Sequence, residues 1–302
     1  RRNKGRLMSE TDTATPAPSS ASPTQGDKAQ ADKAQRDKRS EQPKKDESFI
    51  AFLFWLVLGV VVLRSFIISP FNIPSESMLP RLLNGDYLFA SKWSYGYSKY
   101  SLPFSLPLIP GRVFASQPER GDVAIFKAPP GNDVDYIKRV IGLPGDEVQV
   151  KGGQVWLNGK PVPRVKQPDF VLPVTPNTHC YAPEFEGTDA KGKPVCNYPQ
   201  YRETLPNGKS YNVLDLGQTP QDDTGVYVVP EGQMFMMGDN RDNSLDSRFP
   251  AVEGQGIGIV PQENLVGKAS VMMFSTDGSA NWFLPWTLSL IHISEPTRPR
   301  LI

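Results

Sequence analysis

The sequence contains only two histidines and two cysteines among 302 residues, and this scarcity limits the chemistry available to it. His179 stands beside Cys180, and His292 lies near the C-terminus. A Ser-His-Asp triad therefore has little support. The H-E-x-x-H motif of zinc hydrolases, the P-loop and the dinucleotide-binding fingerprint are all absent. The sequence predicts no metal site and no cofactor, and a hydrolase of this composition needs a base other than histidine.

Long amphipathic helices are a second feature that the sequence lacks. Outside one apolar segment, no stretch combines helical periodicity with helical length, and the chain carries 25 glycines and 30 prolines. Short β-branched segments between turn residues predict an all-β domain instead. Asn158-Gly159 adds a strong signal for a hairpin turn. The predicted strands are Val123–Phe126, Tyr136–Gly142, Val148–Val150, Val155–Leu157, Val226–Val229, Gln233–Met237, Ile257–Val260 and Leu265–Phe274.

One long apolar run is present, Phe49–Ile68, and Arg64 is its only charged residue. As a helix it would be about 30 Å long, the thickness of a bilayer's hydrocarbon core. A signal peptide is the main alternative. The 48 residues in front of the run, its length and the lack of an Ala-x-Ala site after it oppose that interpretation. A buried core helix this apolar would need a larger protein around it. We therefore predict a transmembrane helix over 49–69, ended by Ser69-Pro70.

Charges near this segment predict its orientation. Lys44 and Lys45 flank its start, which favours a cytoplasmic N-terminus. Arg64 lies one turn from the far end, where it can extend to the interface. The domain predicted over 70–287 is then extracytoplasmic.

Both ends of the chain are predicted to lie outside the folded domain. Residues 1–48 have almost no large apolar side chains and predict a disordered cytoplasmic tail. Met8 is a plausible native start, so residues 1–7 are set apart. Leu288–Ile302 resembles translated adaptor sequence, and we interpret it as a non-native tail. This segment contains His292.

The two cysteines, Cys180 and Cys196, lie within 160–224, a region rich in Pro, Asn, Asp and Gly that predicts an irregular insertion. Disulfides persist outside the cytoplasm. A local disulfide between these cysteines would contribute about 3 kcal/mol in the chain-entropy model. Zinc is a poor alternative, because His179 is the only histidine nearby.

Two further pieces leave two interpretations open. Tyr95–Pro118 includes the apolar loop Leu102–Pro110, and Asn281–Trp286 is rich in aromatic residues. Each either contacts a membrane interface or packs on the core of the domain.

Ile73–Arg81 carries two serines, Ser75 and Ser77, just past the apolar run. Pro74 and Pro80 prevent a continuous helix here, because each lacks an N–H and restricts the residue before it. A serine held rigidly in this way is either a linker residue or a nucleophile. Without further context the linker interpretation is the simpler one.

A lysine base is the chemistry that the composition still allows. Burial among apolar groups can lower a lysine pKa from about 10.4 towards 7–8. In the predicted strand, Tyr136, Lys138 and Val140 share one face, which would place the amine between apolar groups. A solvent-facing lysine on an edge strand is the alternative. Gly238–Arg248 is unusually rich in charged and hydroxyl groups, and a plain surface loop is its alternative.

Together these segments resemble the bacterial type I signal peptidases, also called leader peptidases, over roughly 64–277. Two features depart from that family. Threonine is usual at the position of Arg81, and many members have two membrane helices before the serine box where this chain shows one. The matching boxes are Pro74-Ser75-Glu76-Ser77-Met78 with Pro80, Tyr136-Ile137-Lys138-Arg139 with Gly142-Leu143-Pro144-Gly145-Asp146, and Gly238-Asp239-Asn240-Arg241-Asp242-Asn243-Ser244 with Asp246, Ser247 and Arg248. Arg64-Ser65-Phe66 and Arg120-Gly121-Asp122-Val123 also match.

The resemblance implies a serine endopeptidase with a Ser–Lys dyad that removes signal peptides from preproteins after small residues, in the Ala-x-Ala pattern. Ser77 would be the nucleophile and Lys138 the general base. The Ser77 N–H and the Ser75 hydroxyl would form the oxyanion hole, and Ser244 would orient Lys138. Tyr136, Asp246 and Arg248 would support the site, the last two as a pair that shapes the loop.

The implied location is the bacterial inner membrane, with a single pass and a periplasmic catalytic domain. The bilayer and preprotein signal peptides are the implied partners, and the export machinery is a further candidate. Two other classes of protein stay open. One is a catalytically inactive, membrane-tethered β binding module. The other is a self-cleaving regulator with a Ser–Lys dyad, which would need a DNA-binding helix-turn-helix; residues 1–48 contain none, and no nucleic-acid partner is predicted. A penicillin-binding type enzyme is excluded, because its Ser-x-x-Lys box would need lysine where the chain has Pro80.

Overall fold

The computed structural model describes residues 45–276 of the chain. The predictions for residues 1–44, for Asn281–Trp286 and for the tail Leu288–Ile302 lie outside the described residues. Up to Leu56 the described chain is helical, and the residues from Val57 onward contain all the strands that the structure describes.

The apolar run forms helix α2 (Lys45–Val62), which continues as a π-helical turn, η1 (Leu63–Ile67). The side chains of α2 from Ser48 to Val62 are exposed. Within the helical run formed by α2 and η1, the segment Ser48–Ile67 is long and apolar enough to cross a membrane. The helical run begins and ends at other residues than predicted.

Lys45–Ser48, predicted to belong to the disordered tail, are the first turn of α2. The helical run ends at Ile67 rather than at Ser69, because β1 (Ile68–Asn72) already pairs with β2 (Asp86–Ser91). Ser69 and Pro70 lie opposite Ala90 and Phe89 in this pairing. Proline is tolerated there because β1 is an edge strand.

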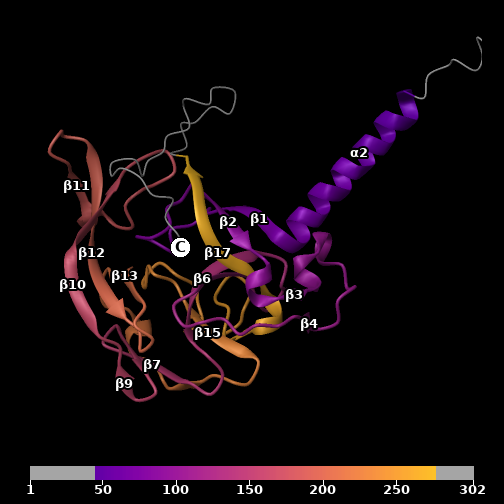
Figure 1. The fold of residues 1–302 in the computed structure, drawn as a ribbon. Helices are drawn as coiled ribbons and strands as arrows, with labels where there is room; N and C mark the ends of the chain where they lie inside the picture. The colour runs from indigo at the N-terminus through magenta and orange to yellow at the C-terminus, as the bar shows by residue number, and fades with distance from the viewer. Residues whose placement is uncertain (1–44, 277–302) are drawn as a thin grey trace, which may run out of the picture. The chain divides into compact units, whose positions relative to one another are not determined.

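A seven-stranded antiparallel sheet forms the centre of the β domain (Figure 1). Its order is β1, β2, β17 (Leu265–Ser275), β5 (Val123–Lys127), β6 (Asp135–Gly142), β15 (Gln233–Met237) and β16 (Val260–Pro261). β6 therefore lies between two neighbours, and its residues from Ile137 to Gly142 are buried. Any polar side chain on this stretch is removed from bulk water.

Three smaller sheets and several short helical turns complete the domain. The first contains β14 (Tyr227–Val228), β7 (Glu147–Lys151), β8 (Gln154–Leu157) and β9 (Lys160–Pro161). The second contains β10 (Arg164–Pro173), β12 (Pro194–Thr204), β11 (Glu186–Thr188) and β13 (Ser210–Leu214). The third pairs β3 (Tyr97–Ser98) with β4 (Arg112–Val113). The 3₁₀ turns are η2 (Trp93–Tyr95), η3 (Lys99–Ser101), η4 (Pro103–Ser105), η5 (Pro183–Phe185), η6 (Pro220–Asp222) and η7 (Gln262–Asn264).

The all-β prediction is confirmed, with several differences in detail. Asn158 and Gly159 both have positive φ, 52° and 74°, as the predicted hairpin turn between β8 and β9 requires. The insertion expected to be irregular contains two long paired strands, β10 and β12, which form a curved ribbon in Figure 1. The strand predicted over Ile257–Val260 is wrong for most of its length, because Gly258 has a φ of +58° and extended pairing begins only at Val260. The strands β1 and β2, before Val123, were not predicted.

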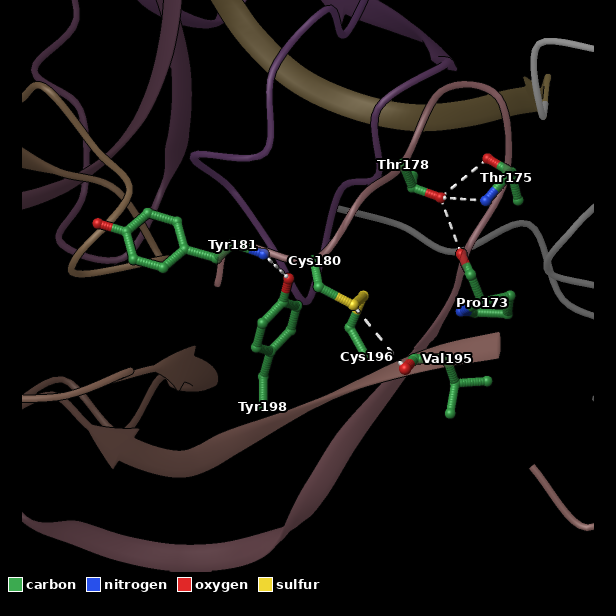
Figure 2. Close-up of a disulfide and its surroundings, with 8 residues drawn as sticks. All are labelled: Pro173, Thr175, Thr178, Cys180, Tyr181, Val195, Cys196 and Tyr198. Carbon is green, nitrogen blue, oxygen red and sulfur yellow. Dashed lines mark hydrogen bonds between the residues drawn. A yellow bond between two sulfur atoms is a disulfide. The ribbon is translucent and has the colours of Figure 1, made fainter. Parts of the chain in front are cut away.

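A disulfide joins the loop before η5 to strand β12 (Figure 2). Cys180 and Cys196 have Cα atoms 5.4 Å apart and are separated by 16 residues in sequence. The Tyr181 N–H next to the bridge donates a 2.9 Å hydrogen bond to the Tyr198 hydroxyl, which ties the same loop to β12. Closing a loop of this size stabilises the fold by about 3 kcal/mol in the chain-entropy model.

The apolar loop within Tyr95–Pro118 is folded into short turns but does not bury its apolar tip. Leu106 and Leu108 are 45% and 73% exposed, and Phe114 is 83% exposed. These side chains do not pack on the core of the domain. Of the two interpretations left open by the sequence, core packing is therefore wrong for this tip.

Candidate active site

Three segments that are far apart in sequence meet at one cavity of about 500 Å³. Ser75 and Ser77 come from the loop after β1, Lys138 from β6, and Ser244 from the loop after β15. Much of the rest of the lining is apolar, with Phe71, Ile73, Ile125, Val134, Ile137 and Leu245 among its members. The cavity thus combines hydroxyl groups and one amine with small apolar surfaces.

Ser77 is held by the residues that follow it. Met78 and Leu82 are fully buried in the cluster around β2, β5 and β17, whereas Leu79 and Leu83 are buried against β12 and the disulfide. The turn is closed by Leu82 N–H donating to the Met78 carbonyl at 3.0 Å. Because these residues anchor in two different cores, the serine before them has a fixed position.

Lys138 lies on the central strand β6 and is 3% exposed, so the edge-strand alternative is wrong. Its Nζ is 2.6 Å from Ser77 Oγ and 5.5 Å from the centre of the Tyr136 ring. Burial lowers the pKa of Lys138 to about 8, since the charged ammonium loses its hydration there; Asp246 and Asp239 oppose this shift, and Arg248 adds to it. Close to neutral pH the amine can therefore lose its proton and accept one from the serine.

Ser244 lies in the same cavity but makes no hydrogen bond within the described residues. The sequence predicts a hydrogen bond from Ser244 to Lys138, and the structure does not contain it. Ser244 packs instead against the backbone of Gly238, so closely that a Cβ at Gly238 would overlap its hydroxyl. The only hydrogen bond described for Lys138 Nζ in residues 45–276 is the one with Ser77 Oγ.

Asp246 and Arg248 form a buried ion pair, with Arg248 Nε donating to Asp246 Oδ1 at 2.9 Å. Burial by itself would raise the pKa of Asp246, but the charge and hydrogen bonds of Arg248 outweigh it and keep that pKa below the ordinary value. Asp246 also accepts a 3.1 Å hydrogen bond from the Gly238 N–H. The ion pair therefore shapes the loop that carries Ser244.

Three further residues in this region were given no individual role by the sequence, although two of them belong to the box Gly238–Ser244. The Asn240 backbone N–H donates to the Ser77 carbonyl at 3.1 Å, and its side chain donates to the Glu76 carbonyl at 3.2 Å. Asn240 thus joins the loop after β15 to the serine loop. The sequence signal that could have pointed to Asn240 is its position two residues after Gly238, within the box Gly238–Ser244.

The other two are the buried carboxylates Asp239 and Glu203. Arg139 makes a bidentate pair with Asp239, at 2.7 and 2.5 Å, and Arg241 makes one with Glu203, at 2.8 and 2.6 Å. Glu203 belongs to the insertion, 38 residues before Arg241, so no local pattern could have predicted this contact. Within residues 45–276, no group of three or more His, Cys, Asp or Glu side chains is arranged to hold a metal.

Comparisons with known proteins identify the family to which the chain belongs. A family profile described as "Signal peptidase, peptidase S26" matches residues 47–274. A signal peptidase I of Rickettsia typhi is 40% identical over 239 residues, covering 76% of this chain and 80% of that protein. A signal peptidase I of Rickettsia prowazekii is 39% identical over 239 residues, with the same coverage of 76% and 80%.

A crystal structure of a signal peptidase I from Enterococcus faecalis V583 is 25% identical, with a TM-score of 0.27, and covers 51% of this chain and 98% of its own. Family membership rests on the profile and on the two Rickettsia proteins. The profile spans most of the chain, and the two relatives are 40% and 39% identical to it over 80% of their own length. The chain therefore belongs to the signal peptidase family, peptidase S26, and is a serine peptidase.

Proposed function

We propose that this chain removes signal peptides from preproteins with a Ser–Lys dyad formed by Ser77 and Lys138. The observation that carries the proposal is the 2.6 Å distance between Lys138 Nζ and Ser77 Oγ at a buried site that lowers the lysine pKa to about 8. A lysine that is partly neutral near pH 7 can act as the base that histidine supplies in other serine peptidases.

In the first half of the reaction, the Ser77 hydroxyl donates its proton to neutral Lys138 Nζ while Oγ attacks the scissile carbonyl. The resulting ammonium then donates a proton to the leaving amine, and an acyl-enzyme remains on Ser77. In the second half, Lys138 accepts a proton from water as the water attacks the ester. Lys138 then returns this proton to Ser77 Oγ as the ester bond to the signal peptide breaks. The signal peptide leaves, and the dyad is restored.

The oxyanion would be held by the Ser77 backbone N–H and the Ser75 hydroxyl. Ser75 is exposed, lines the same cavity, and has its Oγ 3.4 Å from Ser77 Oγ. The Ser77 carbonyl is already occupied by the Asn240 N–H, which keeps the peptide plane of the serine loop in place. Such preorganised donors act mainly on the charge that develops in the transition state.

The cavity supports a preference for small residues at the −1 and −3 positions of the substrate. Its apolar lining includes Ile73, Ile125 and Ile137, all of which are buried and belong to the packed core of the domain. Side chains that are part of a core cannot move aside cheaply, so a large substrate side chain would meet them. Alanine-sized side chains fit such shallow apolar surfaces.

The membrane would bring the substrate to the site. We propose that α2 anchors the chain in the inner membrane of a bacterium with a cytoplasmic N-terminus and a periplasmic β domain. Ser77 is ten residues beyond Ile67, where the helical run ends, so it lies at most about 35 Å from that end. The exposed Leu106, Leu108 and Phe114 would enter the interface beside it. A signal peptide still in the bilayer presents its cleavage site at this level. The export machinery is a candidate partner in that setting.

The first test is cleavage of a preprotein in detergent by the full chain, with mass spectrometry of both products. We expect a single cut after a small residue, and Ser77→Ala should abolish it while the fold is retained. Ser270→Ala, on β17 away from the cavity, is the matched control and should cleave normally. Cleavage by Ser77→Ala at the parent rate would refute Ser77 as the nucleophile. No cleavage by the folded parent would refute the peptidase and favour a binding module.

The roles of Ser75 and Ser244 are tested in the same assay. We expect Ser75→Ala to lower kcat by about 10²–10³-fold, the usual effect of losing one oxyanion donor. Ser244→Ala should lower kcat as well, if its unpartnered hydroxyl bonds Lys138 once Ser77 has become acylated. Neither variant should change the unfolding temperature by more than a few degrees, since Ser75 is exposed and the Ser244 hydroxyl makes no hydrogen bond in the described chain. A parent-like kcat in either variant contradicts the role given to that residue.

A further inference from the structure

A second cavity, of about 480 Å³, lies beside the catalytic one and has no part in the proposed chemistry. It is lined by the end of the apolar helical run, by the start of β1 and by the turns of the apolar loop. All of these residues belong to the part of the chain that begins at Val57. The two cavities share Phe71 and Asp135 in their linings.

Three basic side chains face this cavity, namely Arg64, Lys92 and Lys127, and Asp135 is the only carboxylate among its lining residues. Lys127 pairs with Asp135 at 3.1 Å, which leaves the charges of Arg64 and Lys92 in excess. The positive charge is therefore not balanced by the lining itself.

Lys92 is buried, with 6% exposure, and its Nζ donates to the Ser101 carbonyl at 2.8 Å. Burial lowers the pKa of Lys92 to about 8; Asp135 opposes the shift, and the like charges of Arg64 and Lys127 add to it. A buried ammonium with like charges nearby is unfavourable by itself, and an anion in the cavity would relieve both effects.

The cavity also contains a buried hydroxyl group without a hydrogen-bond partner. Ser65 lines the cavity, is 2% exposed, and its Oγ makes no hydrogen bond within the described residues. Buried hydroxyls are normally satisfied, so an orphaned one points to a missing ligand atom. A phosphate would supply acceptors both for this hydroxyl and for the two excess cations.

Apolar groups line the same cavity. Val60 and Val61 lie one turn before Arg64 and Ser65 on the helical run, and Leu102 and Pro103 come from the apolar loop. A phospholipid joins a phosphate to apolar chains through glycerol, which matches this mixture. A free inorganic phosphate would leave the apolar part of the lining without a partner.

We propose that this cavity binds the phosphate of an anionic phospholipid headgroup at the foot of the apolar helix. The site would seat the β domain on the lipid surface with the catalytic cavity next to it. The inference depends on the proposed membrane anchoring but not on the proposed catalytic chemistry.

The test is native mass spectrometry of the full chain in detergent, titrated separately with phosphatidylglycerol, phosphatidylcholine and inorganic phosphate. We expect one tightly bound phosphatidylglycerol, with weaker phosphatidylcholine binding. Arg64→Gln and Lys92→Met should each weaken phosphatidylglycerol binding about fivefold or more. Because Lys92 is buried and its variant could misfold, the exposed Arg64 provides the independent measurement. Lys99→Met, a nearby lysine outside the cavity lining, should bind like the parent.

Phosphatidylglycerol binding that is unchanged in Arg64→Gln and in folded Lys92→Met would overturn the proposal. Inorganic phosphate bound as tightly as phosphatidylglycerol would overturn the lipid assignment. The titration is repeated on Ser77→Ala, whose lipid binding should equal that of the parent. A failure of the catalytic proposal is thereby kept apart from a failure of the lipid proposal.

Discussion

Replacing Lys138 by Met should abolish preprotein cleavage, with a loss of about 10³-fold or more, because general base catalysis by a positioned side chain contributes roughly 10²–10⁴-fold. Methionine keeps most of the side-chain volume but cannot accept the proton of Ser77. The measurement is kcat/KM on a preprotein in detergent. Lys151→Met, at an exposed position on β7, is the matched control and should cleave like the parent. Cleavage that survives Lys138→Met would leave the serine and refute the lysine base.

The pH dependence of the parent follows from the same side chain. Catalysis needs neutral Lys138, whose pKa is about 8. We therefore expect kcat/KM to rise about tenfold per pH unit below pH 8 and to level off above it. A profile that levels off near pH 5 or 6 would contradict an amine as the base.

Lys138→Met should also stabilise the folded chain near neutral pH. The folded pKa of about 8 lies below the ordinary lysine value of 10.5, so the unfolded state binds more protons between those two pH values. Stability of the parent should therefore rise with pH from about 8 to 10.5. Below pH 8 the full penalty for burying the ammonium is present, up to about 3 kcal/mol. Thermal unfolding of the parent and the variant at pH 7 and at high pH measures it, and a lower unfolding temperature for Lys138→Met at pH 7 would contradict the expectation.

Gly238→Ala should give the second large effect. A Cβ at this position would overlap Ser244 Oγ and lie 2.6 Å from the Ser77 carbonyl oxygen. The Ser77 carbonyl cannot yield easily because it accepts from Asn240, and the Gly238 N–H is held by Asp246. Rotation of the Ser244 hydroxyl would not remove the overlap, because Ser244 Cβ would also lie 2.5 Å from the added Cβ. Overpacking of this kind costs about 1–3 kcal/mol, and displacement of the nucleophile should lower kcat by about 10²-fold or more.

The control for Gly238→Ala is Gly225→Ala, at an exposed glycine with no atom within 4 Å of the added Cβ. It should leave both kcat and the unfolding temperature close to those of the parent. Activity and unfolding temperature of Gly238→Ala are measured beside it. Parent-like kinetics in Gly238→Ala would show that the serine loop and the loop after β15 are not packed as tightly as described.

Local patterns were sufficient for several parts of the fold. The strand β15 has the bounds that the sequence predicts, and β5, β6 and β17 differ from prediction by one residue at one or both ends, because each is a short apolar run bounded by turn residues. The insertion was misjudged, since its strands β10 and β12 carry Pro, Asn and charged residues that read as loop. Their pairing with each other, which no single segment reveals, is what makes them regular.

The sequence by itself indicated which residues could form the proposed catalytic site, through a resemblance. The separate patterns left Ser77 as a linker residue and Lys138 on a solvent-facing edge strand. Only the three boxes together, with their likeness to the signal peptidases, implied a Ser–Lys hydrolase. The sequence also determined the apolar helical run, because its length and lack of charge depend on no other part of the chain.

Only the tertiary structure decided how these residues act together. It buried Lys138 on an inner strand of the sheet, where neighbouring segments remove water and lower the pKa, although the strand pattern alone favours an edge strand. It left Ser244 without the hydrogen bond that the resemblance implies, brought Asn240 to the serine loop, and paired Glu203 with Arg241. The pKa of an amine and the partner of a hydroxyl are set by the atoms around them in space, and those atoms come from segments distant in sequence.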